Sequence, residues 1–136
     1  MEQARELIIT RKPGLEENDI IIAETLLKVQ FPDKYRELVK LVNQAEIDEW
    51  IFYPIKDSKR IAKTSDDIVR NNTLVNYSNI TEKMIWIGED GTGDLIGYKM
   101  NENGHLNEEI YHFNHESQEI ILVYDDIEDM IMELLV

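Results

Sequence analysis

The sequence contains no cysteine, which excludes disulfides, a catalytic thiolate, a zinc ribbon and a thiolate-bound iron–sulfur cluster. Long apolar runs are also missing, because the longest, at residues 20–23 and 120–124, are far too short to cross a bilayer. The first nine residues include charges and lack the apolar core of a secretory signal. These absences fit a cytoplasmic protein and predict no membrane attachment.

Positive charge is scarce in this chain. The 136 residues include 14 Lys and Arg against 28 Asp and Glu, which gives a net charge of −14. Such a chain repels nucleic acid and anionic membranes over most of its surface and favours a basic partner, although acidity can also serve solubility alone. The 43% hydrophobic and 31% charged residues predict one globular domain over residues 1–136.

Helical periodicity dominates the first half of the chain. Asn18 can cap a helix that runs to about Gln30. Its expected core stripe and the residues that widen the stripe are Ile22, Leu26 and Val29 with Ile20, Ala23 and Leu27. Pro32 suits the first turn of a second helix. The core-facing residues of that helix, at positions i, i+3, i+4 and i+7, are Tyr35, Leu38, Val39 and Val42.

Strand signals dominate the second half of the chain. The expected strands cover residues 50–53, 84–87, 94–100, 109–114 and 119–124, with turns at 88–94 and 102–104. Asp125 can open a final helix, with Glu128 three residues on as in a capping box. Helices, then an antiparallel meander, then a helix indicate an α+β fold with a four- to five-stranded sheet and helices on one face.

A glycine-rich segment, residues 88–94, suggests a phosphate-binding loop. The third glycine of a dinucleotide motif is missing, however, because position 96 is Ile. Glu89, Asp90 and Asp94 would also repel a phosphate. Calcium is a weaker alternative, since the spacing fits no EF-hand loop. We therefore expect a tight turn between two antiparallel strands that needs glycine dihedrals.

The remaining reactive side chains give little support to catalysis or metal binding. On a strand, His112 and His115 would point to opposite faces, so they cannot chelate one ion unless the strand breaks. No Gly-x-Ser-x-Gly nucleophile motif occurs. The sequence thus predicts no catalytic residue, no metal and no cofactor. A small carboxylate-dependent enzyme stays an alternative, and it would need a deep pocket that holds two carboxylates with perturbed ionisation.

Five segments, in this order, resemble a known family. They read ETLL at 24–27, FPDKY at 31–35, WIFYPI at 50–55, IGEDGTGD at 87–94 and YHFNHE at 111–116. Over roughly residues 15–135 the chain resembles the SMI1/KNR4 family, also called the SUKH superfamily. Phe113 and Asn114 stand where the family's W-D-H-E segment has Trp and Asp, and residues 43–45 read Asn-Gln-Ala where it often has Asn-Gly-Gly.

The resemblance implies an α+β fold with an antiparallel or mixed four- to six-stranded sheet, helices packed on one face and no catalytic activity. Bacterial members resemble immunity proteins that bind and neutralise polymorphic toxins, often nucleases, and fungal members resemble intracellular hubs tied to cell-wall regulation. We therefore expect an antitoxin that binds a basic toxin domain as a monomer or weak dimer, with an interaction scaffold as the alternative. The partner-binding residues that the resemblance implies are Trp50, Tyr53, Glu89, Asp90, Asp94, His115 and Glu116.

Overall fold

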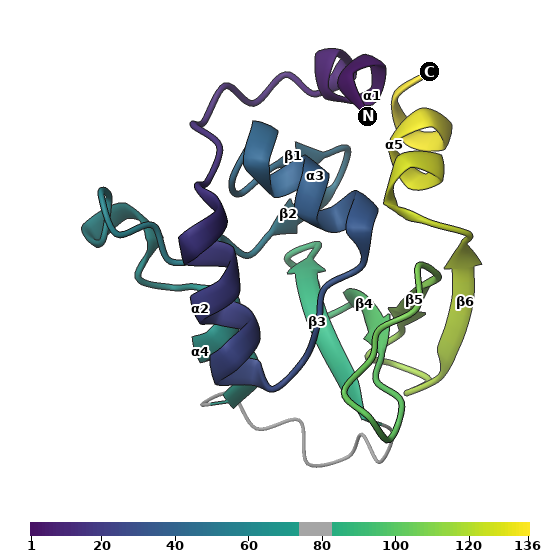
Figure 1. Ribbon diagram of the computed structural model, residues 1–136. Coiled ribbons are helices and arrows are strands. Elements are labelled where there is room, and N and C mark those ends of the chain that lie inside the picture. The colour runs from purple at the N-terminus through teal and green to yellow at the C-terminus, as the bar shows by residue number, and fades with distance from the viewer. Residues whose placement is uncertain (74–82) are drawn as a thin grey trace.

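A computed structural model describes residues 1–73 and 83–136 of the chain (Figure 1). Within these residues lie five α-helices and a six-stranded antiparallel sheet, which confirms the predicted α+β fold. The helices are α1 (Glu2–Leu7), α2 (Glu17–Leu27), α3 (Asp33–Leu41), α4 (Ile68–Thr73) and α5 (Ile127–Leu135), with a 3-10 turn at Ala62–Thr64. The strands are β1 (Glu46–Ile47), β2 (Trp50–Phe52), β3 (Met84–Glu89), β4 (Leu95–Lys99), β5 (Ile110–Phe113) and β6 (Ile120–Tyr124). No helix in this described part has the length and apolar character needed to cross a bilayer.

The strands follow one another across the sheet in the order β1-β2-β3-β4-β5-β6, and each pairs antiparallel with the next. The predicted strands agree with the observed ones to within two residues at each end. The sequence does not predict β1, because its two residues are too few to show alternation. Since Leu95 pairs with Phe113, the turn after β3 and the turn after β5 lie at the same end of the sheet.

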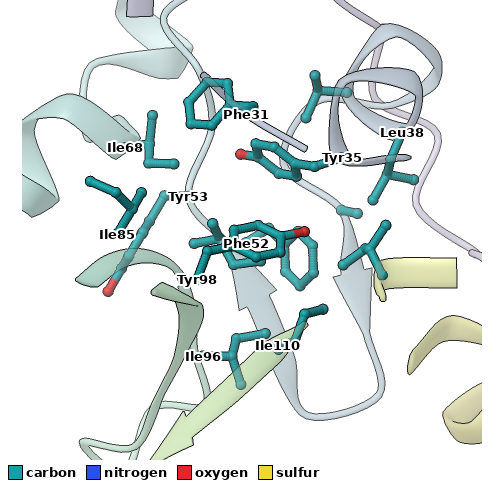
Figure 2. Packing of buried hydrophobic residues seen from close by; sticks show 14 of the residues in the cluster. Phe31, Tyr35, Leu38, Phe52, Tyr53, Ile68, Ile85, Ile96, Tyr98 and Ile110 are labelled. Atoms are coloured by element: carbon teal, nitrogen blue, oxygen red, sulfur yellow. The ribbon is translucent and has the colours of Figure 1, made fainter. Parts of the chain in front are cut away.

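The hydrophobic core lies between the sheet and the helices that cover one face of it. Figure 2 shows Tyr35 of α3 above Tyr98 of β4, and both residues are fully buried. Their ring centroids are 6.0 Å apart in an edge-to-face arrangement, and Phe31 lies 4.9 Å from Tyr35 in the same manner. Such aromatic pairs add about 1 kcal/mol each to the free energy of burial, so they fix α3 on the sheet.

Helices α2 and α3 differ in how well the spacing of their hydrophobic residues predicts which face is buried. The four core residues predicted for α3, of which Val42 directly follows the helix, are all buried, because polar residues occupy the opposite face. In α2, by contrast, the predicted Ile22 and Leu26 are 50% and 60% exposed, and the core contacts come from Ile20, Ala23 and Leu27. Apolar residues surround most of α2, so their spacing selects no single face.

The observed helix caps differ from the predicted ones. Helix α5 is capped by Asp126 rather than Asp125, and the Asp126 carboxylate accepts a hydrogen bond from the backbone N–H of Asp129 at 2.7 Å. Helix α2 begins after Glu16, so Asn18 lies inside its first turn. The first difference is a shift between two adjacent aspartates that are equally suited to capping. In α2, the N-cap residue Glu16 makes no side-chain cap hydrogen bond, and the start differs by two positions from the prediction.

The two ends of the chain meet. Helix α1, which the sequence does not predict, packs beside α5 through buried Ala4 (Figure 1). The ammonium group of Met1 lies 3.0 Å from Oε2 of Glu128 in α5. The position of α1 therefore depends on its contacts with α5.

Strand β6 forms one open edge of the sheet, because in the described part of the chain its strand neighbour is β5 alone. Ile121 and Leu122 point to opposite faces of the sheet and are 52% and 49% exposed. Exposed Glu119 and Asp125 stand immediately before and after the strand. The edge is thus apolar in its centre and acidic at both ends.

Candidate partner-binding site

Two turns form the candidate site at one end of the sheet. Strand β3 continues to Glu89, because Gly88 and Glu89 pair with β2, so the predicted turn at 88–94 is shortened to 90–94. Strand β5 ends at Phe113, so residues 114–119 form the second turn. The pairing of Leu95 with Phe113 sets the two turns side by side. Most of the acidic residues predicted to bind a partner lie on these turns.

Asp94 joins the two turns through its carboxylate. Its Oδ2 lies 2.8 Å from Nε2 of His112, and its Oδ1 lies 2.6 Å from Nδ1 of His115. Oδ1 also accepts a hydrogen bond from the backbone N–H of His115 at 3.0 Å. The expectation that the two histidines lie on separate faces is therefore wrong. The strand stops at Phe113, and the chain then curls so that both imidazoles reach one carboxylate.

The hydrogen bonds around Asp94 decide its charge. Burial opposes ionisation of the carboxyl group, but the backbone N–H of His115 and the imidazoles of His112 and His115 outweigh burial and lower the pKa of Asp94 to about 2. The bond to Asp94 in turn raises the pKa of His115, against a smaller effect of burial, and the charges of Glu116 and Asp90 act in the same direction. The cluster thus favours a carboxylate paired with a protonated His115.

Local backbone geometry holds the first turn in shape. The Oδ1 atom of Asp90 accepts hydrogen bonds from the backbone N–H of Thr92 at 2.9 Å and from its hydroxyl at 2.7 Å. Gly93 has a φ of +112°, a conformation that glycine adopts most readily. A Cβ atom on Gly93 would lie 3.0 Å from Cγ of His115. Glycine is therefore required there both by the dihedral angle and by the close imidazole.

The second turn presents a carboxylate to solvent. The side-chain oxygen of Asn114 accepts hydrogen bonds from the backbone N–H groups of Glu116 at 2.9 Å and Ser117 at 3.1 Å. The Glu116 side chain is 84% exposed, and its nearest charged neighbour is Nε2 of His115 at 4.0 Å. Glu116 is thus positioned by its backbone and left free at its carboxylate.

The two predicted aromatic residues lie beneath this acidic surface. Trp50 is 3% exposed, and its ring meets the His112 imidazole edge-on with centroids 5.2 Å apart. Tyr53 is 6% exposed and donates its hydroxyl hydrogen to Oε2 of Glu89 at 3.1 Å. The structure therefore gives both rings a supporting role under the charged groups, and direct contact with a partner stays a prediction for them.

His112 is the member of the cluster that sequence reasoning missed. Its ring supports both Asp94 and Trp50, from a strand position that the sequence marks only as half-buried. The register of the β4–β5 hairpin could have revealed this role. Pairing of Ile96 with His112 brings His112 close to Asp94, which directly precedes β4. We refer below to Glu89, Asp90, Asp94, His112, His115 and Glu116 as the acidic end.

The chemistry available at the acidic end is that of carboxylates and the two imidazoles of His112 and His115. The described residues contain no group of three or more His, Cys, Asp or Glu side chains that could hold a metal ion. One cavity among them measures about 480 Å³ and is lined by a single carboxylate, that of Asp57. Two smaller cavities each have two carboxylates in their lining, Asp19 with Asp67 in one and Asp33 with Glu108 in the other. The enzyme alternative therefore stays a prediction.

The fold and the acidic end together define a small α+β protein with a braced, negatively charged surface. A family model described as SMI1-KNR4 cell-wall, SUKH_6, matches residues 17–131. The chain belongs to this SUKH family, whose members are typically non-catalytic immunity or regulatory proteins. No curated protein matches the chain.

Proposed function

We propose that this protein is an immunity protein that binds and neutralises a bacterial polymorphic toxin, and that the toxin is a nuclease with a basic surface. The proposal assigns it no catalysis, cofactor or metal and places it in the cytoplasm, where it would protect the cell that makes it. Family membership supports a binding role. The observation that carries the proposal is the acidic end, where the last residue of β3 and the two turns present exposed Glu89 and Glu116 with half-buried Asp90.

Electrostatics favours a basic toxin domain as the partner. A nuclease needs cationic side chains to hold the phosphates of its substrate. The net charge of −14 attracts such a surface over distances near the Debye length, which speeds association. The fixed turns then present carboxylates without a large loss of conformational freedom on binding. In the proposed complex the acidic end occupies the groove that nucleic acid would otherwise fill.

The test uses the toxin encoded by the adjacent gene, expressed from an inducible promoter. If that gene encodes a polymorphic toxin, co-expression of this protein should restore growth, and titration calorimetry should show a stoichiometric complex. Asp90→Lys with Glu116→Lys should weaken binding by about 2 kcal/mol or more if their contacts are buried, and by about 1 kcal/mol or less if they lie at the rim.

The matched control reverses two exposed carboxylates elsewhere, Glu2→Lys with Glu6→Lys, and so changes net charge by the same amount. This control should bind and protect like the parent protein. Higher salt should slow association more than it speeds dissociation. Full protection by the first double variant, with loss of protection in the control, would place the binding surface elsewhere.

A second candidate is a scaffold in cell-wall regulation, which the description of the matching family favours. A scaffold would bind several intracellular partners and would have no toxin gene beside it. Growth rescue from one neighbouring toxin supports the immunity proposal. Specific binding to several cell-wall regulatory proteins, with no effect on any toxin, supports the scaffold.

A further inference from the structure

The cavity of about 480 Å³ is lined by four cations in a protein whose net charge is −14. Arg11 and Lys12 enter it from the segment after α1, and Arg60 and Lys63 enter it from the loop that carries the 3-10 turn. The single carboxylate in the lining is Asp57. The sequence marks residues 56–63 as cationic but gives no sign that Arg11 and Lys12 join them. We call this set of four cations and its cavity the basic cavity.

Most of these cations keep their charge uncompensated. Nζ of Lys12 donates to the neutral side-chain oxygen of Gln44 at 2.7 Å, and Arg11 donates to the carbonyl oxygen of Ile8. Lys63 has no carboxylate partner among the described residues. Five cations outside the cavity do pair with carboxylates, namely Lys34, Arg36, Lys40, Lys59 and Arg70. With twice as many acids as bases in the chain, this local excess of positive charge stands out.

A second arginine adds to the repulsion. Arg5 donates to the same Ile8 carbonyl as Arg11, at 3.2 Å, so two guanidinium groups share one neutral acceptor. Burial, and then the charge of Arg11, lower the pKa of Arg5. An anion bound beside Arg11 would relieve this repulsion.

The basic cavity is built on a fixed floor. Asn43, which is 4% exposed, donates from its side-chain amide to the carbonyl oxygen of Ile55 at 2.8 Å and accepts from the Ile55 N–H at 2.9 Å. Its own backbone N–H donates to the carbonyl oxygen of Pro13 at 3.0 Å. One buried residue thus ties together the three segments that carry the lining, so the backbone positions of the cations are fixed before any ligand arrives.

Asp57 is already engaged by its own loop. Its Oδ2 accepts from Arg60 Nη1 at 2.8 Å, its Oδ1 accepts from the backbone N–H of Lys59 at 2.9 Å, and its backbone N–H donates to the hydroxyl of Thr64 at 3.0 Å. Asp57 therefore orients Arg60 and offsets one of the four positive charges. The cavity keeps a net positive charge.

We infer that the basic cavity binds a small phosphate-bearing anion. Arginine and lysine side chains that converge on a preformed hollow supply several charge-assisted donors, which phosphate oxygens accept well. A volume of about 480 Å³ suits a small molecule. The net charge of −14 repels an extended polyanion such as nucleic acid, so the ligand is compact enough to lie within the cavity.

Inorganic pyrophosphate is a suitable probe, with amide chemical shifts and calorimetry as readouts at constant ionic strength. We expect a saturable curve with a Kd below about 1 mM and shifts confined to residues 11–12, 43–44 and 57–64. Arg11→Gln with Lys63→Gln should weaken binding by at least about tenfold. The control Lys28→Gln with Lys56→Gln removes the same charge outside the cavity and should change the Kd by less than about twofold.

Each other outcome overturns the inference. Absence of saturable binding to the parent protein excludes the site, and equal weakening by both double variants shows general electrostatics instead. Citrate binding as tightly as pyrophosphate would remove the preference for phosphate. Because the cavity variants leave the acidic end intact, they should still protect cells from the toxin, so this test and that of the proposed function can fail separately.

Discussion

The acidic end and the basic cavity hold their charges in opposite ways. Asp94 accepts three hydrogen bonds from His112 and His115, so its charge is largely satisfied within the chain. Arg11 and Lys12 hold neutral oxygens, which fix their positions and leave their charge in place. A charge held by neutral groups keeps its field available to a ligand, whereas a charge held by opposite charges acts mainly as a brace.

The same distinction applies inside the acidic end. Asp94 serves as the brace between two turns, while Glu116 and Glu89 are exposed to a partner, Glu89 with one carboxylate oxygen already bonded to Tyr53. Substitution of Asp94 should therefore mainly lower the free energy of unfolding, and substitution of the exposed carboxylates should mainly weaken partner binding. In the basic cavity, changes to the cations should alter ligand affinity with little effect on folding.

Loss of Gly93 should have the largest effect. Gly93→Val forces a branched side chain into a φ of +112° and against the His115 ring, so the free energy of unfolding should fall by about 3 kcal/mol. Gly91→Val is the control, because Gly91 also has a positive φ, of +85°, but a Cβ atom there meets nothing within 4 Å. It should cost about 1 to 2 kcal/mol. Urea denaturation measures both, and equal losses would show that contact with His115 is unimportant.

Removal of the Asp94 carboxylate should come next. Asp94→Ala leaves His112 and His115 without their acceptor, and we expect a loss of about 2 kcal/mol in the free energy of unfolding. Glu116→Ala removes a carboxylate that is 84% exposed and should change stability by less than about 0.5 kcal/mol. Thermal and urea unfolding test the pair. Similar losses for both variants would contradict the role of Asp94 as a brace.

A smaller effect is expected from neutralising the one carboxylate of the basic cavity. Asp57→Asn keeps an acceptor for the backbone N–H of Lys59 but frees the charge of Arg60. Pyrophosphate affinity should therefore rise about three- to tenfold, which calorimetry can measure on the folded variant. A fall in affinity, with the fold unchanged by circular dichroism, would show that Asp57 positions Arg60 for the ligand more than it neutralises it.

The smallest effect is the pH dependence of the His115–Asp94 pair. The raised pKa of His115 means that its protonated form stabilises the fold below about pH 6.5, and this contribution is lost as pH rises through the raised value. The pKa of Asp94 is lowered from 3.8 to about 2, so its contribution is present above pH 3.8 and is lost as pH falls towards 2.

The stability difference between the parent protein and His115→Gln should thus be widest between about pH 4 and 6 and should narrow above that range. Urea denaturation at pH 5, 7 and 9 measures the difference. A gap that is constant or widens with pH would show that the His115 charge does not contribute.

The sequence predicts those parts of the fold in which local pattern and tertiary packing agree. The polar and apolar faces of α3 are distinct, so its buried residues could be identified in advance. Helix α2 is apolar on most sides, and only packing decides that Ile20 faces the core while Leu26 does not. Strand β1 exists because β2 pairs with it, which no two-residue pattern can show.

The sequence also predicts part of the candidate site, where the local pattern agrees with the tertiary structure. The glycines and carboxylates of residues 88–94 indicate a turn whose side chains are exposed, and that turn forms half of the acidic end. The contact of His115 with Asp94 depends on where β5 stops, a boundary that sequence places only within a residue or two. The basic cavity joins residues more than 40 positions apart, such as Arg11 and Arg60, and this proximity arises from the tertiary fold alone.

The acidic residues that border β6 have a consequence for the protein at high concentration. Two copies that paired their β6 edges in antiparallel register about Leu122 would match their apolar segments in full, but each would set Glu119 opposite Asp125 of the other. This repulsion opposes edge-to-edge association of an otherwise adhesive strand. Near pH 4.5, where the net charge of the chain approaches zero, that protection weakens, and aggregation should begin along this edge.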